Sequence, residues 1–141
     1  MALSWPACSG PQQISGIDAE ITTAGSVEIT AELLEIPGKF PPNDLYDYAY
    51  VLKYQVRAVH RGQVASRNIL VAHYNPLKLR SEAEDEFSGK VGGTVRRFKE
   101  GDLHRLALEE PLDDHYMGGV IDKFQEDGTR YWSVWANLVV E

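Results

Sequence analysis

Residues 46–60 read YDYAYVLKYQVRAVH. The odd positions of this stretch include Asp47, Lys53, Gln55 and Arg57, whereas the even positions from 46 to 58 are all apolar or aromatic. Side chains alternate between the two faces of a strand, and a helix would scatter the tyrosines around its circumference. The stretch therefore predicts a long strand with one apolar face, made of Tyr46, Tyr48, Tyr50, Leu52, Tyr54, Val56 and Ala58.

Strands are also predicted on both sides of this stretch. Residues 26–34 alternate between apolar and polar side chains, and NILVAHY at 68–74 follows a short polar connection. A short connection between two strands favours an antiparallel hairpin. We expect Val56 near His73, which places Ile69, Val71 and His73 on the face of the tyrosines.

The second half of the chain predicts one long loop and then further strands. The loop runs from 75 to 102, with a helical turn at SEAEDEF, residues 81–87. A strand starts at Leu103 and stops before Pro111, VIDKFQ at 120–125 predicts a short strand, and Asp127-Gly128 is a hairpin-turn signal. The last strand covers 130–140, where we expect Trp132, Val134, Ala136 and Leu138 to face the core.

Five or six strands with few helical signals predict an all-β protein. The expected architecture is a small antiparallel barrel, OB-like, because one very long strand among five can curl and close the sheet. A two-sheet β-sandwich is the alternative. Residues 1–25 are expected to be an irregular N-terminal segment that ends in a short strand, and residues 26–141 a single β-barrel domain.

Composition excludes some classes of partner. The chain has 141 residues and a formal net charge of −7, which argues against nucleic-acid binding because phosphates are held by Lys and Arg. No apolar run is long enough for a membrane helix, so no membrane insertion is expected. Cys8 is the single cysteine, which excludes an internal disulfide and a cysteine-based zinc site. No motif predicts a cofactor.

A polar cluster follows the strand that starts at Leu103. Asp113, Asp114 and His115 come just after Glu109 and Glu110. Oxygen atoms and an imidazole gathered in this way suit polar contacts to a ligand, or a hard cation such as calcium or magnesium. The alternative is a solvated loop whose aspartates cap turns, and we assign no metal ligands to the chain.

Two aromatic side chains of the last strand are the candidates for stacking. If Trp132 faces the core, Tyr131 and Trp135 face outward beside Ser133 and Asn137. Aromatic faces cover the apolar side of a sugar ring while polar neighbours bind its hydroxyls. The alternative, favoured by the register of the Asp-Gly turn, is that the loop at 111–125 covers Tyr131 and Trp135.

The histidines His60, His73, His104 and His115 share no catalytic or metal-binding motif. His60 and His73 are expected on one inner face, where a lone histidine is usually a hydrogen-bonded core residue. No nucleophile motif is present, so no catalytic residue is assigned.

Several blocks of the sequence resemble a known kind of domain. YDYAYVLKYQVRAVHRG, ILVAHY, FKEGDLHRLALEEPLDDHY and RYWSVW occur in the order typical of a little-characterised β domain. That domain accompanies alginate O-acetyltransferase-like proteins, which carry an SGNH-hydrolase-like unit in bacterial envelope polysaccharide pathways. The resemblance implies an accessory module with an extracytoplasmic location. It implies no catalytic residue, because Leu103 follows Gly101-Asp102 where that unit has its nucleophilic serine.

These observations lead to one functional prediction and two alternatives. The prediction is a non-catalytic binding or accessory module with polysaccharide as ligand, which would use Tyr131, Trp135, Asp113, Asp114 and His115. One alternative is a small hydrolase or lyase that combines histidines with carboxylates. The other is a domain that binds a protein partner.

Overall fold

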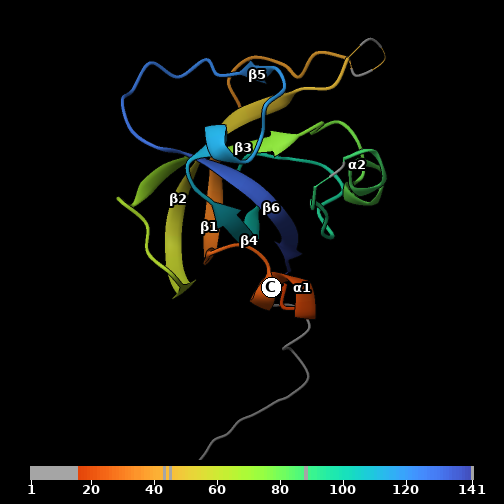
Figure 1. Ribbon diagram of the computed structural model, residues 1–141. Coiled ribbons are helices and arrows are strands. Elements are labelled where there is room, and N and C mark those ends of the chain that lie inside the picture. Colours follow the sequence, from red (N-terminus) through yellow and green to blue (C-terminus); the bar gives the residue numbers. More distant parts are fainter. Residues whose placement is uncertain (1–15, 43, 45, 88, 141) are drawn as a thin grey trace, which may run out of the picture.

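The computed structural model describes residues 16–42, 44, 46–87 and 89–140. Within these ranges the chain is mostly β (Figure 1). The strands are β1 (Val27–Glu35), β2 (Ala49–Arg61), β3 (Asn68–Tyr74), β4 (Leu103–Glu109), β5 (Val120–Ile121) and β6 (Arg130–Val139). The helices are short: α1 (Ala19–Thr23), α2 (Arg80–Glu86) and the 3₁₀ turn η3 (Leu112–Asp114).

All six of these strands belong to one sheet, in the order β1-β4-β6-β3-β2-β5. Strand β1 also pairs with β2, so the pairings lead from β1 through β4, β6, β3 and β2 back to β1. The prediction of an all-β chain is confirmed. The two-sheet sandwich is wrong because a single sheet contains every described strand. A purely antiparallel sheet is also wrong, because β3 pairs with β6 and β2 with β5 in parallel.

The tyrosine-rich stretch forms the centre of the core. Tyr48, Tyr50 and Tyr54 are fully buried, as the alternation predicts. Tyr46 is 54% exposed, because it lies before the first residue of β2. The first core, on this face of the sheet, includes Val27, Ile29, Ala31, Leu33, Tyr48, Tyr50, Leu52, Tyr54, Val71, Phe98, Leu106, Leu108 and Tyr131.

The β2–β3 hairpin has a different register from the predicted one. His73 pairs with Tyr50 instead of Val56, a displacement of six residues. The reason is that β2 continues beyond the hairpin, and its second half pairs with β1, where Val59 lies opposite Ile29. Because six is an even number, His73 still lies on the predicted face.

A bulge in β6 explains why half of its predicted faces are wrong. Ala107 pairs with Trp135 and Leu108 with Ser133, so Val134 is an extra residue between them. An extra residue exchanges the two faces of a strand beyond it. Ala136 and Leu138 therefore belong to the first core as predicted, but Trp132 and Val134 lie on the opposite face. The predicted outward position of Tyr131 is wrong, since this residue is 1% exposed in the first core.

The opposite face of the sheet carries a second core, which the connecting segments cover. It includes Ile21, Ala24, Val51, Leu70, Ala72, Tyr74, Ala83, Val91, Leu112, Tyr116, Trp132 and Val134. Helix α2 confirms the predicted helical turn in the long loop. The predicted hairpin at Asp127-Gly128 is wrong, because β5 pairs with β2 and not with β6.

The N-terminal segment differs from the prediction where the structure describes it. Residues 1–15 lie outside the described ranges. Helix α1 occupies Ala19–Thr23, where we expected irregular backbone and a short strand. The Asp18 side chain accepts a hydrogen bond from the amide of Ile21 at 2.7 Å, which caps this helix. No helix within the described ranges has the length and apolar character to cross a membrane.

Candidate functional site

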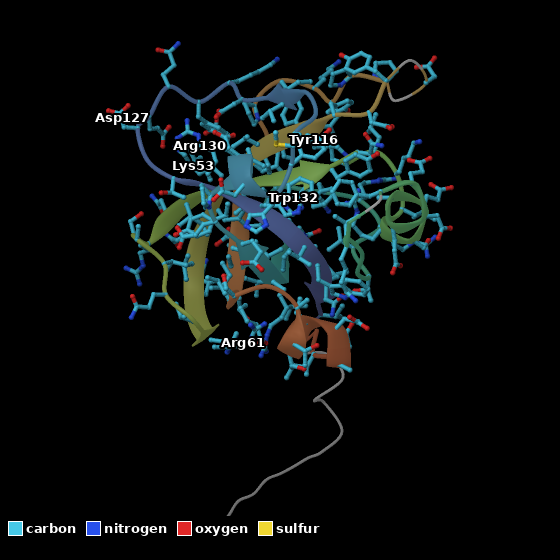
Figure 2. All side chains as sticks on the ribbon, viewed as in Figure 1. Lys53, Arg61, Tyr116, Asp127, Arg130 and Trp132 are labelled. Carbon is cyan, nitrogen blue, oxygen red and sulfur yellow. The ribbon has the colours of Figure 1, made fainter. Side chains whose placement is uncertain are left out.

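Four aromatic rings meet on the second core. Tyr116 stacks on Trp132 with ring centres 4.9 Å apart and planes 10° from parallel. Phe87 lies 5.4 Å from Trp132 and 4.9 Å from Tyr74. We call Tyr74, Phe87, Tyr116 and Trp132 the aromatic cluster; Figure 2 labels Tyr116 and Trp132. Rings in contact at these distances contribute more than their buried area alone.

Each ring of the aromatic cluster comes from a different element. Tyr74 ends β3, Phe87 caps the C-terminus of α2, and Trp132 belongs to β6. Tyr116 follows η3, and its amide donates to the carbonyl of Leu112 at 3.0 Å. Leu112 is 5% exposed and fixes η3 on the sheet. The cluster thus depends on the whole fold and not on one local motif.

A groove of about 410 Å³ borders the aromatic cluster. Its apolar lining residues include Phe87, Trp132 and Val134, and its polar lining residues are Lys90, Glu109 and His115. We call this the aromatic groove. It contains one of the five predicted site residues, His115, whose exposed side chain comes from the turn that also supplies Tyr116.

The polar lining of the aromatic groove includes a cation, Lys90, and a carboxylate, Glu109. Lys90 forms an ion pair with Glu20 at 2.6 Å, and its ammonium lies 5.4 Å from the ring centre of Trp135. Glu109 accepts a hydrogen bond from the Ser26 hydroxyl at 2.7 Å. A carboxylate has more acceptor positions than this one hydrogen bond uses. Glu109 can therefore also accept hydrogen bonds from a ligand.

The two aromatic residues predicted to bind sugar lie in different places. The hydroxyl of buried Tyr131 accepts a hydrogen bond from the amide of Ala65 at 3.2 Å. Trp135 lies on the predicted outward face and is half-buried. Its indole nitrogen donates to Asp18 at 3.3 Å. The segment of Lys90 covers Trp135, whereas the loop at 111–125 covers Trp132, so the predicted cover for Tyr131 and Trp135 is wrong.

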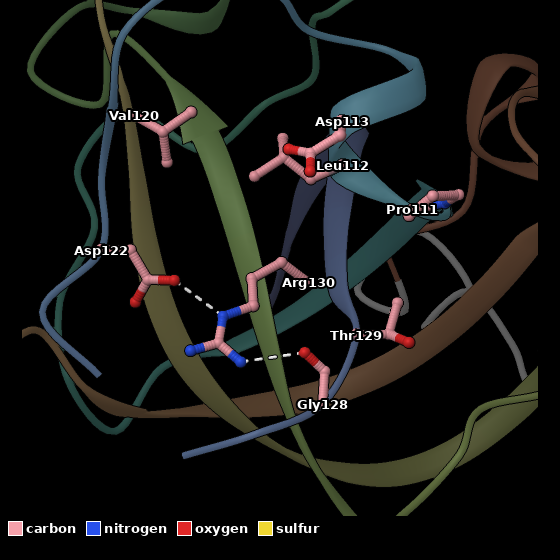
Figure 3. Close-up of a pocket in the computed structure, with 8 residues that line it drawn as sticks. All are labelled: Pro111, Leu112, Asp113, Val120, Asp122, Gly128, Thr129 and Arg130. Atoms are coloured by element: carbon pink, nitrogen blue, oxygen red, sulfur yellow. Dashed lines mark hydrogen bonds and ion pairs between the residues drawn. The ribbon is translucent and has the colours of Figure 1, made fainter. Parts of the chain in front are cut away.

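The predicted cluster Asp113, Asp114 and His115 is exposed and divided between two cavities. His115 lines the aromatic groove, and Asp113 lines a separate cavity of about 360 Å³ together with Asp122 and Arg130 (Figure 3). There the guanidinium of Arg130 donates to Asp122 at 2.7 Å. Asp114 is an exposed residue of η3.

The described residues do not gather a metal site. Among them, no three His, Cys, Asp or Glu side chains are arranged so that they could hold an ion. The cation interpretation of the 109–115 segment therefore finds no support in the geometry.

Two histidines meet in the first core. The Tyr54 hydroxyl lies 2.9 Å from Nε2 of His73 and 2.9 Å from Nδ1 of His104. Burial lowers the pKa of His104 to about 4 and that of His73 well below its usual range, the latter with help from Arg80. Both rings are therefore neutral at pH 7, as expected of core histidines.

The histidine predicted to share a face with His73 lies elsewhere. His60 is exposed near the end of β2, with its Nε2 2.7 Å from the Thr30 hydroxyl. The expected pairing of His60 and His73 on one inner face is wrong, because β2 leaves the first core in its second half.

The sequence missed most residues of the aromatic groove. Phe87 and Lys90 lie in the long loop, where no periodicity marks a face. Trp132 was assigned to the same face as Ala136 and Leu138, because the bulge at Val134 leaves no trace in the alternation of residues 130–140. The aspartates and histidine of the 113–115 segment were the one signal that pointed to this region.

Comparison with protein-family models, with curated proteins and with solved structures finds no match for this chain.

Proposed function

We propose that this chain is a non-catalytic carbohydrate-binding module built on an OB-like barrel. The aromatic groove is the proposed site. The observation that carries this proposal is that one groove is lined both by the polar side chains of Glu109, His115 and Lys90 and by the apolar side chains of Phe87, Trp132 and Val134.

The barrel is inferred from the strand pairings. Five strands that pair in the ring β1-β4-β6-β3-β2 enclose a core when the sheet is strongly twisted. The first core would then fill the interior of the barrel. Helix α2 lies between β3 and β4 in the sequence. An OB-fold is a five-stranded barrel, and proteins of this kind bind oligonucleotides and oligosaccharides. The net charge of −7 favours the saccharide.

The chemistry of the aromatic groove also favours a sugar. A pyranose presents C–H groups on one face and hydroxyls around its edge. The C–H face would pack on Phe87 and the exposed edge of the aromatic cluster, while the hydroxyls would bond to Glu109 and His115. Glu109 also suits a ligand with an amino group.

The test begins with a glycan array and continues with titration of the best ligand. We expect the glycan to shift the indole N–H signal of Trp132 in a nitrogen–proton NMR spectrum. The paired substitutions Glu109→Gln and His115→Ala should weaken binding about tenfold or more, since the first replaces a charged acceptor by a weaker neutral one and the second removes a hydrogen bond to the ligand.

Asp127→Asn is the matched control, because Asp127 is exposed in the 122–129 loop and does not line the aromatic groove (Figure 2). Binding that is equally weak in the control and in the groove variants would contradict the proposal. So would an array without any retained glycan.

A second candidate function has one observation in its favour. Glu109 and His115 line the same groove, which is the combination that general acid–base chemistry uses. A hydrolase or lyase would convert the retained glycan, so mass spectrometry of the glycan after incubation separates this candidate from simple binding. The His73–Tyr54–His104 cluster offers less support, because no carboxylate among the described residues bonds to it.

The resemblance to a domain of bacterial envelope polysaccharide proteins agrees with a carbohydrate ligand. On that basis we propose an accessory role in an extracytoplasmic compartment. A protein partner is the remaining alternative, and size-exclusion chromatography with candidate envelope proteins tests it.

A further inference from the structure

Arginines line a second surface, on the segment that follows Lys90. Two cavities of about 460 and 250 Å³ share Leu79, Thr94 and Arg96. Arg97 lines the larger cavity, and Arg80 and Ser81 line the smaller one. We call the two cavities together the arginine groove. It brings three guanidinium groups to one part of a chain whose net charge is −7.

None of these three arginines has a carboxylate partner among the described residues. The ion pairs among the described residues all involve other cations. Within the same residues, Arg96 and Arg97 form no hydrogen bond to another side chain. Asp102 lines the larger cavity but forms no ion pair with Arg96 or Arg97. Three guanidinium groups without a carboxylate partner leave their N–H donors available to an anion from outside the chain.

Arg80 adds a buried charge to the same surface. It is 3% exposed, and its terminal nitrogen donates to the carbonyls of Asn75 and Lys78 at 2.7 and 3.1 Å. Its guanidinium carbon lies 5.2 Å from the ring centre of Phe98. The Nε atom is buried without a partner. A buried cation without a counter-charge is costly unless an anion comes close.

The backbone that carries Arg96 and Arg97 is held in place by β6. The amide of Val95 donates to the carbonyl of Ala136 at 3.2 Å, and the amide of Thr94 donates to the Asn137 side chain at 3.0 Å. Leu138 donates back to the Thr94 hydroxyl at 3.0 Å. The arginines therefore extend from a fixed platform, which reduces the entropy lost when they bind a ligand.

We propose that the arginine groove binds an oxyanion group of an acidic saccharide, a carboxylate or a phosphate. A guanidinium presents parallel N–H donors that match two oxygens of such a group. Arg96 and Arg97 would contact it directly, the Ser81 hydroxyl would donate to it, and Arg80 would supply a positive potential from below. The saccharide part of this proposal rests on the proposed function, whereas the oxyanion site does not.

Nucleic acid is the competing source of phosphate, and the lining of the groove argues against it. Single-stranded nucleic acids bind proteins by stacking their bases on aromatic side chains. Beside its arginines, the arginine groove is lined by leucine, threonine, serine, glycine, valine and aspartate, and no aromatic side chain of the described ranges lines either cavity.

The test is an NMR titration of the full chain with galacturonate, with galactose and with inorganic phosphate. Galacturonate and galactose differ in the carboxylate that replaces a hydroxymethyl group. We expect galacturonate, phosphate or both to shift the amide signals of residues 79–81 and 93–97, and galactose to leave them unchanged. Shifts with galacturonate identify a carboxylate site, and shifts with phosphate alone identify a phosphate site.

The variant Arg96→Ala/Arg97→Ala should lose about tenfold or more in affinity for the active anion, because it removes the charge-assisted hydrogen bonds. The control is Lys39→Ala/Arg67→Ala, which makes the same change in net charge at exposed residues outside the groove. Equal losses in both variants would overturn the proposal, since they would indicate unspecific attraction. No shift with either anion would also overturn it.

Two further measurements separate this proposal from the proposed function. Glycans that depend on Glu109 and His115 should bind Arg96→Ala/Arg97→Ala normally if they are neutral. A chain that binds galacturonate through the arginines but no glycan in the aromatic groove would retain the oxyanion site and refute the aromatic groove. Tighter binding of a single-stranded oligonucleotide than of polygalacturonate would refute the saccharide assignment.

Discussion

Tyr54 has one hydroxyl proton for two buried imidazoles. It can donate to one ring and accept from the N–H of the other. The outer nitrogens, Nδ1 of His73 and Nε2 of His104, have no partner among the described residues. One of them must carry a proton and the other a lone pair, whichever way the hydroxyl points. The three residues therefore depend on one another for their protonation.

Replacing Tyr54 by Phe tests this dependence. The variant leaves the two bonded nitrogens unsatisfied as well, and each unsatisfied buried group costs about 1–3 kcal/mol. We expect a loss of about 2–4 kcal/mol in the free energy of urea unfolding. Tyr50→Phe is the control, since it removes a single bond to the Pro37 carbonyl and should cost about 1 kcal/mol. Equal losses in the two variants would contradict the shared role of the Tyr54 hydroxyl.

The buried histidines predict a loss of stability in mild acid. The pKa of His104 is about 4 in the folded chain and near 6.5 when unfolded, so the unfolded chain binds more protons between these values. Stability is complete above pH 6.5 and falls as the pH decreases toward 4. From pH 7 to pH 5, His104 alone should cost about 2 kcal/mol, and His73 acts in the same direction.

Urea unfolding at pH 7 and at pH 5 measures this loss. His104→Gln is less stable at pH 7 but cannot titrate, so its stability should change less between the two pH values. If the wild type and the variant lost the same stability between pH 7 and pH 5, His104 would not contribute to the acid sensitivity.

Gly93 occupies a position that other residues cannot take. Its φ is +123°, and a Cβ atom there would overlap the carbonyl oxygen of Ala136. Gly128 has nearly the same φ, +125°, with nothing within 4 Å of its Cβ position. Gly128→Ala should therefore cost only the backbone strain, about 1–3 kcal/mol.

Gly93→Ala should cost a further 1–3 kcal/mol or so, because the segment must move away from β6. Thermal unfolding of the two variants gives the comparison. The arginine groove should also lose anion affinity in Gly93→Ala and keep it in Gly128→Ala. A Gly93→Ala variant as stable as Gly128→Ala would show that the segment does not pack closely on β6.

At the scale of elements, alternation in the sequence located most strands. It did not always show which side chains lie on which face of the strand. Residues 46–58 have one uninterrupted apolar face, so β2 was predicted correctly, and so was its buried side from Tyr48 to Val56. Residues 130–140 are apolar on both faces, because each face of β6 packs in a core. In such a strand the position of a bulge cannot be inferred from polarity, and Tyr131 and Trp132 were assigned to the wrong sides.

The register of the β2–β3 hairpin depended on information that lies outside the hairpin. A short connection was the simplest interpretation of residues 61–67. The pairing of the second half of β2 with β1 requires contacts between residues about 30 positions apart, such as Ile29 and Val59. Sequence patterns within one element do not report such contacts, although they correctly assigned His73 to its face.

The candidate sites were the least predictable part, for a related reason. The aromatic groove combines β6 with two segments that have no periodicity, around Phe87 and around His115. The arginine groove depends on hydrogen bonds between the 92–95 segment and residues 134–136 of β6, the part of that strand beyond its pairing with β3. Only the fold brings these pieces together, so the sequence could indicate residue types but not their neighbours.

At the scale of the whole molecule, the two cores have different support. The first core contains β1, β4 and most of the large fully buried side chains. The second core is closed by η3, by α1 and by the loops around them, which have few backbone hydrogen bonds to the sheet. Segments held mainly by side chains open with less free energy than the sheet itself. We therefore expect the cover of the second core to open while the strands stay paired.

Native-state hydrogen exchange tests this expectation. The amides of His115 and Tyr116, which donate to Leu112, should exchange through local opening, and those of β1 and β4 only through global unfolding. Tyr116→Ala should speed exchange at the His115 amide. The β1 amides should exchange only slightly faster, because the global stability falls only a little. Leu106→Ala, within the first core, should lower protection of the β1 amides by about 2–5 kcal/mol. If Tyr116→Ala lowered protection of β1 as much as Leu106→Ala does, the cover of the second core would not open separately, and the two cores would unfold as one unit.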